Sequence, residues 1–152
     1  MNWRRRCVII GIMKYVCDAR GGKTWFRLET EAEAEAEAVL MRHAVDKYFR
    51  RYEEIARESH RAPKGAASFE QSIGLKDHIA RTMPVFLTLR ADDGHGLATA
   101  MLAPGGRNQV NFKTIVVGPD NGDPYIAHAE AIATLGAHFG LELKREDCFP
   151  YA

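Results

Sequence analysis

The chain has 152 residues, of which 46% are hydrophobic and 27% are charged, and its formal net charge at pH 7 is +1. This length and composition are typical of one ordinary globular domain that can bury a core without metals or disulfides. They exclude a disordered chain, and the near-neutral charge gives no overall reason to expect nucleic-acid or membrane binding.

The charge is unevenly distributed between the two ends of the chain. Residues 1–29 contain seven Lys or Arg and two acidic residues, whereas residues 119–152 contain two Lys or Arg and six acidic residues. The opening has an Arg run before an apolar run, but Lys14 ends the apolar run early and no small-residue cleavage pattern follows. The apolar run is also too short to span a bilayer. We therefore expect residues 1–12 to be a flexible N-terminal extension and residues 13–152 to form a single α+β domain.

The three cysteines, Cys7, Cys17 and Cys148, form no CxxC or Cys/His spacing, and an odd number cannot all pair within the chain. Cys17 precedes Asp18 and Cys148 follows Asp147, and a neighbouring negative charge raises the pKa of a thiol. We expect three ordinary free thiols in a reducing, cytoplasmic setting. The six histidines have no HxxxH or HExxH spacing, so neither a metal site nor a cofactor is expected.

The N-terminal half predicts a hairpin followed by a long helix. Residues 14–20 and 23–29 are rich in strand-forming residues and flank a Gly pair, which is typical of a β-hairpin. The next stretch, TEAEAEAEAV, alternates with the period of a half-buried strand, but Glu and Ala favour helices and are depleted in strands. Thr30 and Glu33 have the spacing of a capping box. We therefore predict one helix over about residues 31–58.

A heptad-like seam of apolar or small residues runs along this helix, with spacings that alternate between four and three residues. Its members are Ala34, Ala38, Met41, Val45, Tyr48, Tyr52, Ile55 and Ser59. We expect Val45 and Phe49 to face the protein's own core. Tyr48 and Tyr52 are the candidate binding residues, expected at an edge open to another chain because each hydroxyl needs a partner or water. The alternative is that the seam only covers the protein's own sheet.

The C-terminal half predicts two shorter helices and several strands. After the linker HRAPKGAA, residues 68 to about 81 form a helix, and VFLTLRA, LATAMLA and QVNFKTIVV are strand signals. Asp123 and Pro124 begin a third helix that ends near Phe139, and LELK is expected to be a closing strand. The order ββ-αα-βββ-α-β predicts an α+β fold. It is a mainly antiparallel sheet with an N-terminal hairpin, and one long and two shorter helices pack on one face.

The strand and helix order has two topological resemblances. From the second helix onward it is similar to a double-stranded RNA-binding domain, but the start of the last helix, GPDNGDPYIAHAE, is acidic, so nucleic-acid binding is not expected. The same strands resemble the core order of ribonuclease H-like nucleases, in which separated carboxylates hold two Mg²⁺ ions. That resemblance implies Asp92 or Asp93, Glu130 and Asp147 as metal ligands. In that family the first Asp lies within a strand, whereas Asp92 and Asp93 lie in a tight hairpin.

The sequence contains no motif that identifies a catalytic activity. The leading hypothesis is a non-catalytic interaction module, a small cytoplasmic protein of bacterial type that binds a protein partner or forms a homodimer through the helix at 31–58. The runner-up is a divalent-metal-dependent nuclease or phosphodiesterase built on Asp92, Glu130 and Asp147. A third hypothesis is a small-ligand pocket between the sheet and the helices.

Overall fold

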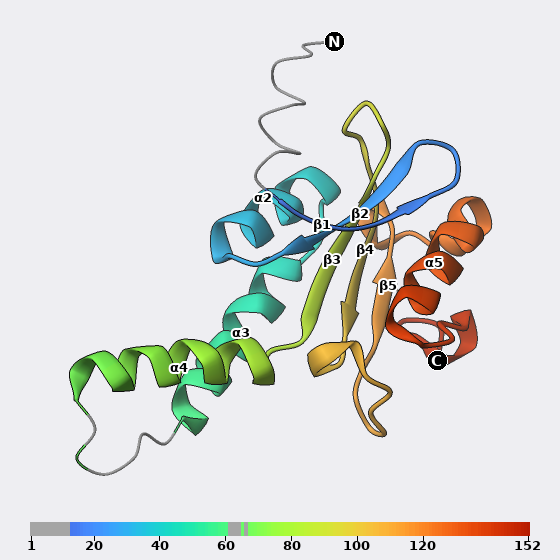
Figure 1. Ribbon diagram of the computed structural model, residues 1–152. Helices are drawn as coiled ribbons and strands as arrows, with labels where there is room; N and C mark the ends of the chain where they lie inside the picture. The colour runs from blue at the N-terminus through green and yellow to red at the C-terminus, as the bar shows by residue number, and fades with distance from the viewer. Residues whose placement is uncertain (1–12, 61–64, 66) are drawn as a thin grey trace.

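The molecule is a five-stranded antiparallel sheet with helices on both faces (Figure 1). The computed structural model describes residues 13–60, 65 and 67–152. The strands are β1 (Lys14–Ala19), β2 (Lys23–Leu28), β3 (Val85–Arg90), β4 (Gly96–Leu102) and β5 (Ile115–Val117), and they follow one another across the sheet in this order. The predicted α+β class and the N-terminal hairpin are confirmed. The extension predicted over residues 1–12 lies outside the described residues.

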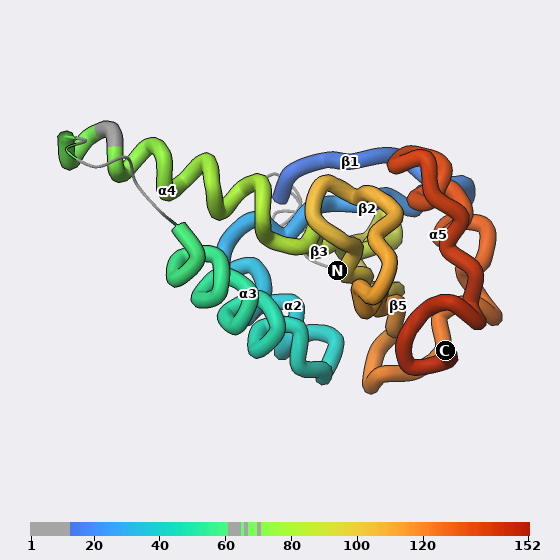
Figure 2. The backbone as a smooth tube through the Cα atoms, turned by 90° about the horizontal axis from the view of Figure 1, so that it is seen from below, coloured from blue at the N-terminus to red at the C-terminus, as the bar shows by residue number. Residues whose placement is uncertain are grey.

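Of the three helices between β2 and β3, the first two lie on one side of the sheet and the third packs against them and projects beyond the sheet, whereas a fourth helix lies on the other side (Figures 1 and 2). The three are α2 (Glu31–Met41), α3 (Val45–Ser59) and α4 (Ser68–Thr82), and the fourth is α5 (Tyr125–Phe139). The structure differs here from the expected one-sided packing. The cause is the composition of the central strand β3, which is buried along its whole length: Val85, Leu87 and Leu89 belong to the core on one face, and Phe86 belongs to the core on the other.

Two hydrophobic cores, one on each face, hold these layers together. The core between the sheet and α5 consists of Trp25, Val85, Leu87, Leu89, Ala98, Ala100, Leu102, Val116, Ala131, Ile132, Leu135 and Cys148. The core on the side of α2 and α3 consists of Met13, Phe26, Leu28, Ala34, Val45, Phe49, Ala56, Met83, Phe86 and Met101. A buried hydrogen bond of 2.9 Å from Trp25 Nε1 to the Ala131 carbonyl fixes α5 against β2.

The helix predicted over 31–58 is two helices, because the chain turns after Met41. Arg42 adopts the left-handed conformation with φ of 55°, and α3 begins at Val45. The predicted capping box is confirmed: the Glu33 amide donates to Thr30 Oγ1, and the Thr30 amide donates to Glu33 Oε1, each at 3.1 Å. The sequence of α2 was therefore interpreted correctly as a helix, and only its length was overestimated.

The last predicted strands are shorter than expected. β5 contains three residues, and Val110, expected within it, is 83% exposed in a loop where Asn111 has a φ of 68°. LELK forms no strand. Instead, Phe149 pairs with β5, where its amide donates to the Thr114 carbonyl at 2.8 Å and its carbonyl accepts from Val116 at 3.3 Å. None of the described helices combines the length and apolar character needed to cross a bilayer.

Candidate functional site

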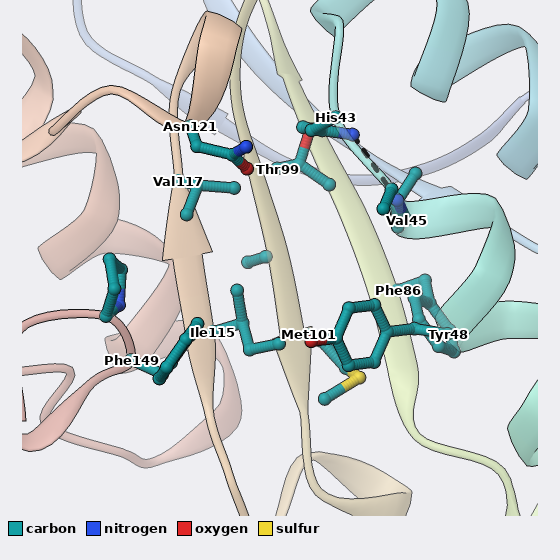
Figure 3. Close-up of a pocket in the computed structure, with 13 residues that line it drawn as sticks. His43, Val45, Tyr48, Phe86, Thr99, Met101, Ile115, Val117, Asn121 and Phe149 are labelled. Atoms are coloured by element: carbon teal, nitrogen blue, oxygen red, sulfur yellow. Dashed lines mark hydrogen bonds between the residues drawn. The ribbon is translucent and has the colours of Figure 1, made fainter.

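A mainly apolar pocket of about 380 Å³ lies on the face of the sheet that α2 and α3 cover, beside the short edge strand β5 (Figure 3). α3 packs over β3 through the rings of Phe49 and Phe86, whose centroids are 5.1 Å apart, and the adjoining face of β4 and β5 forms the pocket floor. The lining residues are His43, Ala44, Val45, Tyr48, Phe86, Thr99, Ala100, Met101, Ile115, Val117, Asn121, Phe149 and Pro150. The volume is within the range of small-molecule sites.

A buried ion pair lies beside this pocket. Glu37 on α2 has a side chain with 0% exposure, and Arg90 at the end of β3 is 5% exposed, with Arg90 Nη2 donating to Glu37 Oε1 at 2.6 Å. Arg90 Nε also donates to Thr88 Oγ1 at 3.0 Å, and Thr99 Oγ1 donates to Glu37 Oε2 at 2.7 Å. Each charge is therefore paired and hydrogen-bonded, as buried charges must be.

His43 connects this network to the pocket. Thr99 Oγ1 directs its proton to Glu37, so it accepts from His43 Nε2, at 2.8 Å. The backbone amide of Val45, the first residue of α3, donates to His43 Nδ1 at 3.4 Å. Burial lowers the pKa of His43 below its ordinary value of 6.5, although the negative charge of Glu37 acts in the opposite direction. The ring is therefore neutral at pH 7, with both nitrogens in hydrogen bonds.

Two other polar side chains in the pocket keep unused hydrogen-bonding capacity. Neither the Tyr48 hydroxyl nor the Asn121 amide is hydrogen-bonded to any residue that the structure describes. Figure 3 shows Asn121 close to Thr99 and His43, whereas Tyr48 reaches the pocket farther along, near Met101. The pocket therefore offers polar groups at two separate places along an apolar floor.

An ion pair closes the rim near Asn121. Arg42 Nε and Nη2 donate to the two carboxylate oxygens of Asp120, which joins the end of α2 to the short helical turn η2 (Pro119–Asn121). Arg42, Asp120 and Asn121 all have left-handed backbone conformations, with φ between 55° and 59°. Such conformations cost energy in residues other than glycine and cluster at functional sites.

The carboxylates expected from the nuclease resemblance are not brought together at one place. Asp92 and Asp93 lie in the β3–β4 turn, where Asp93 Oδ2 is 2.7 Å from His95 Nδ1. Asp147 lies in the turn η3 (Arg145–Asp147), in a polar hollow near Leu102 at the other end of β4. The seven residues of β4 separate the two ends by about 20 Å, at roughly 3.3 Å per residue.

Glu130, the remaining predicted ligand, lies on the exposed side of α5. Its Oε1 is 3.2 Å from Arg20 Nη1 near the β1–β2 turn. Within residues 13–60, 65 and 67–152, no group of three or more His, Cys, Asp or Glu side chains is placed to hold a metal ion.

The seam residues divide between core and pocket. Val45 and Phe49 are buried against the sheet, as expected. Tyr48 and Tyr52 are half-buried: Tyr48 lines the pocket, and the ring centroid of Tyr52 is 6.2 Å from that of Phe112. Much of the seam therefore covers the protein's own sheet, which was the alternative interpretation. The role of the two tyrosines in binding another chain stays a prediction.

The sequence analysis did not single out His43, Thr99, Glu37 or Arg90. A charged residue that directly follows the apolar run VFLTL was the available signal for Arg90, because a charge buried in a central strand requires a buried partner. Nothing in the Glu-Ala run distinguished Glu37 from its exposed neighbours. Comparisons with family models, curated proteins and solved structures gave no match. The function is therefore argued from geometry alone.

Proposed function

We propose that the protein binds a small, mainly apolar molecule in the pocket between α3, β5 and the segment at Phe149. One observation carries the proposal: an apolar floor occurs together with the free hydroxyl of Tyr48 and the free amide of Asn121 in one pocket of about 380 Å³. Small-molecule sites have this composition, because apolar walls provide affinity and a few polar groups fix the orientation of the ligand.

The rigidity of one pocket wall supports the same proposal. His43 is fixed by Thr99 on one side and by the Val45 amide on the other, and the rim is tied by the ion pair of Arg42 with Asp120. A wall that is already ordered loses little conformational freedom when a ligand binds, so more of the contact energy appears as affinity.

Blocking the pocket tests the proposal. Ile115 lies on the pocket floor and is only half-buried, so Ile115→Trp should fill the space at little cost to the fold. The probe is naphthalene-2-carboxamide, which has an apolar bicyclic body and one polar group. Calorimetric titration should detect binding to the wild type, and the melting temperature should rise with probe concentration, because the probe binds only the folded state. Ile115→Trp should abolish both effects.

Val110→Trp is the matched control, because it introduces the same indole side chain at an exposed loop residue outside the pocket. This variant should bind the probe as the wild type does. A wild type that does not bind the probe, or an Ile115→Trp variant that binds it with unchanged affinity, would contradict the proposal.

A second candidate function is the binding of a protein partner or a second copy through α3 and the adjoining helix α4. One observation favours it: within residues 68 and 69 and 71–82, no side chain of α4 is buried, and Phe69 and Ile73, one turn apart, are 74% and 54% exposed. A helix of this length is marginal in water without a packed face, so a partner that covers α3 and α4 would stabilise it.

Light scattering at high protein concentration tests this second candidate. If the wild type self-associates, replacing Tyr48 and Tyr52 together by Glu should lower the association with little loss of melting temperature. Ile115→Trp should leave it unchanged, which separates an interface from the pocket. A strictly monomeric wild type would remove the homodimer proposal. We also propose a reducing, cytoplasmic setting, which the free thiols of Cys17 and Cys148 support.

A further inference from the structure

Lys113 places a positive charge between two aromatic walls of the pocket. Its Nζ lies 3.6 Å from the ring centroid of Phe149 and 5.9 Å from that of Tyr48, which form parts of opposite walls. An ammonium group over a ring face is stabilised by the ring quadrupole and stays partly hydrated. This position leaves the donors of Lys113 free to bind a ligand that enters the pocket.

Lys113 differs from the charged groups of the neighbouring ion pairs. Three carboxylates near the pocket are paired with arginines: Glu37 with Arg90, Asp120 with Arg42 and Asp46 with Arg50. Lys113 forms no ion pair with any residue that the structure describes. A positive charge without an ion-pair partner therefore lies beside two rings that line a mainly apolar pocket, which favours a ligand with one negative charge.

The Tyr48 hydroxyl adds a second donor for the same negative group. Tyr48 and Lys113 are close enough for a cation–π contact, so one carboxylate can accept from both the ammonium group and the hydroxyl. Charge-assisted hydrogen bonds of this kind are stronger than bonds between neutral groups. The floor beyond them, which includes Phe86, Met101 and Ile115, is apolar and fits an aromatic or aliphatic body.

We propose that the ligand is a small amphipathic carboxylate, with its apolar body on the floor of the pocket and its carboxylate held by Lys113 and Tyr48. The inference rests on the proposed ligand-binding function and specifies its ligand class. The neutral His43 lies at the end of the pocket away from Phe149. It fits this orientation, because it provides no charge that would attract the carboxylate to that end.

Two probes of equal shape test the ligand class in the full-length protein. Naphthalene-2-carboxylate and naphthalene-2-carboxamide differ in charge and share the same apolar body. Calorimetric titration at low salt should give the carboxylate about two- to fivefold higher affinity in the wild type, as expected for one solvent-exposed ion pair. Lys113→Met keeps most of the aliphatic side chain and removes the charge, so it should abolish this preference by lowering the affinity for the carboxylate more than that for the carboxamide.

Lys47→Met is the control, because Lys47 is an exposed residue of α3 whose ammonium group lies over neither the Phe149 nor the Tyr48 ring. The preference should persist in this variant and should weaken with added salt, whereas Lys113→Met should show no salt dependence. Equal affinities for the two probes in the wild type, or a preference that survives in Lys113→Met, would overturn the anion assignment and leave the pocket proposal intact. Failure of both probes to bind the wild type would overturn the pocket proposal itself.

Discussion

The buried pair of Glu37 and Arg90 gives a quantitative prediction about stability. The two side chains are 0% and 5% exposed, and their charged atoms are 2.6 Å apart. Glu37→Leu would leave the Arg90 guanidinium buried without a counter-charge and would leave Thr99 without its acceptor. Removing one partner of a buried pair costs about 3–5 kcal/mol. We expect this loss in the free energy of unfolding, which is a large fraction of the total stability of a domain of this size.

The double variant Glu37→Leu with Arg90→Met separates the cost of an unpaired charge from the value of the pair. Replacing both partners by apolar side chains removes the uncompensated charge, so the double variant should be more stable than Glu37→Leu alone. Glu37→Gln keeps the shape and one acceptor oxygen and should lose only about 1–3 kcal/mol. Urea denaturation, followed through the fluorescence of buried Trp25, measures each free energy of unfolding.

Glu35→Leu is the control on the same helix. Glu35 is exposed, and its Oε1 lies 3.3 Å from Arg50 Nη1 in a surface ion pair, so this change should stay within about 0.5 kcal/mol of the wild type. The reasoning is refuted if Glu37→Leu is as mild as Glu35→Leu. It is also refuted if the losses of Glu37→Leu and of Arg90→Met, each measured alone, add in the double variant, because the buried charges would then be energetically independent.

Three further predictions concern a histidine, a pair of glycines and a thiol. The pKa of His43 is lowered from about 6.5 by folding, so below pH 6.5 the unfolded state binds more protons than the folded state. The free energy of unfolding should therefore decrease as the pH is lowered from about 6.5 to the pKa of the folded state. His43→Gln should remove this part of the slope in urea titrations. Gly136→Ala should cost about 1–3 kcal/mol, because its Cβ would lie 2.7 Å from the Leu141 carbonyl oxygen. Gly74→Ala, which meets only ordinary contacts inside a helix, should add about 0.5–1 kcal/mol. The Cys148 thiol, whose pKa is raised by burial, should react with a disulfide reagent only after denaturation.

Each of these predictions has an outcome that would contradict it. His138→Gln, at an exposed position of α5, serves as the control for the pH series, and an equal change in slope for both variants would argue against a special role of His43. A Gly136→Ala variant as stable as the wild type would show that the chain after α5 can move away. Rapid labelling of Cys148 in the native protein would show that its segment opens readily.

The parts of the fold that could be predicted are specified by residues that are close together in the sequence. The hairpin is marked by its Gly pair, and the start of α2 by Thr30 and Glu33. The break after α2 could not be predicted, because no Gly or Pro lies between Met41 and Val45 and both residues continue the seam spacing. The break is stabilised by the hydrogen bond of His43 to Thr99, a residue 56 positions away, which leaves no local signal.

The candidate site was less predictable than the fold, because its parts meet only through tertiary packing. Glu37 and Arg90 are 53 positions apart, and the exposed neighbours of Glu37 have the same composition. The pocket also depends on the shortness of β5 and on the pairing of Phe149 with its edge, whereas the alternating pattern of the sequence indicated a longer strand. Sequence reasoning proposed a small-ligand pocket between sheet and helices but could not locate it.

The short connection between α2 and α3 should tolerate neither insertions nor deletions. Loops between helices usually accept length changes, because their backbone makes few fixed contacts. Here the one residue between His43 and Val45 allows the imidazole to bind both the first amide of α3 and Thr99 of β4. An added residue would separate those two contacts, and a deleted one would rotate α3 by about 100° and turn Phe49 away from the sheet. Homologues that keep the pocket should therefore vary in length at the loop around Val110 and remain constant in length between α2 and α3.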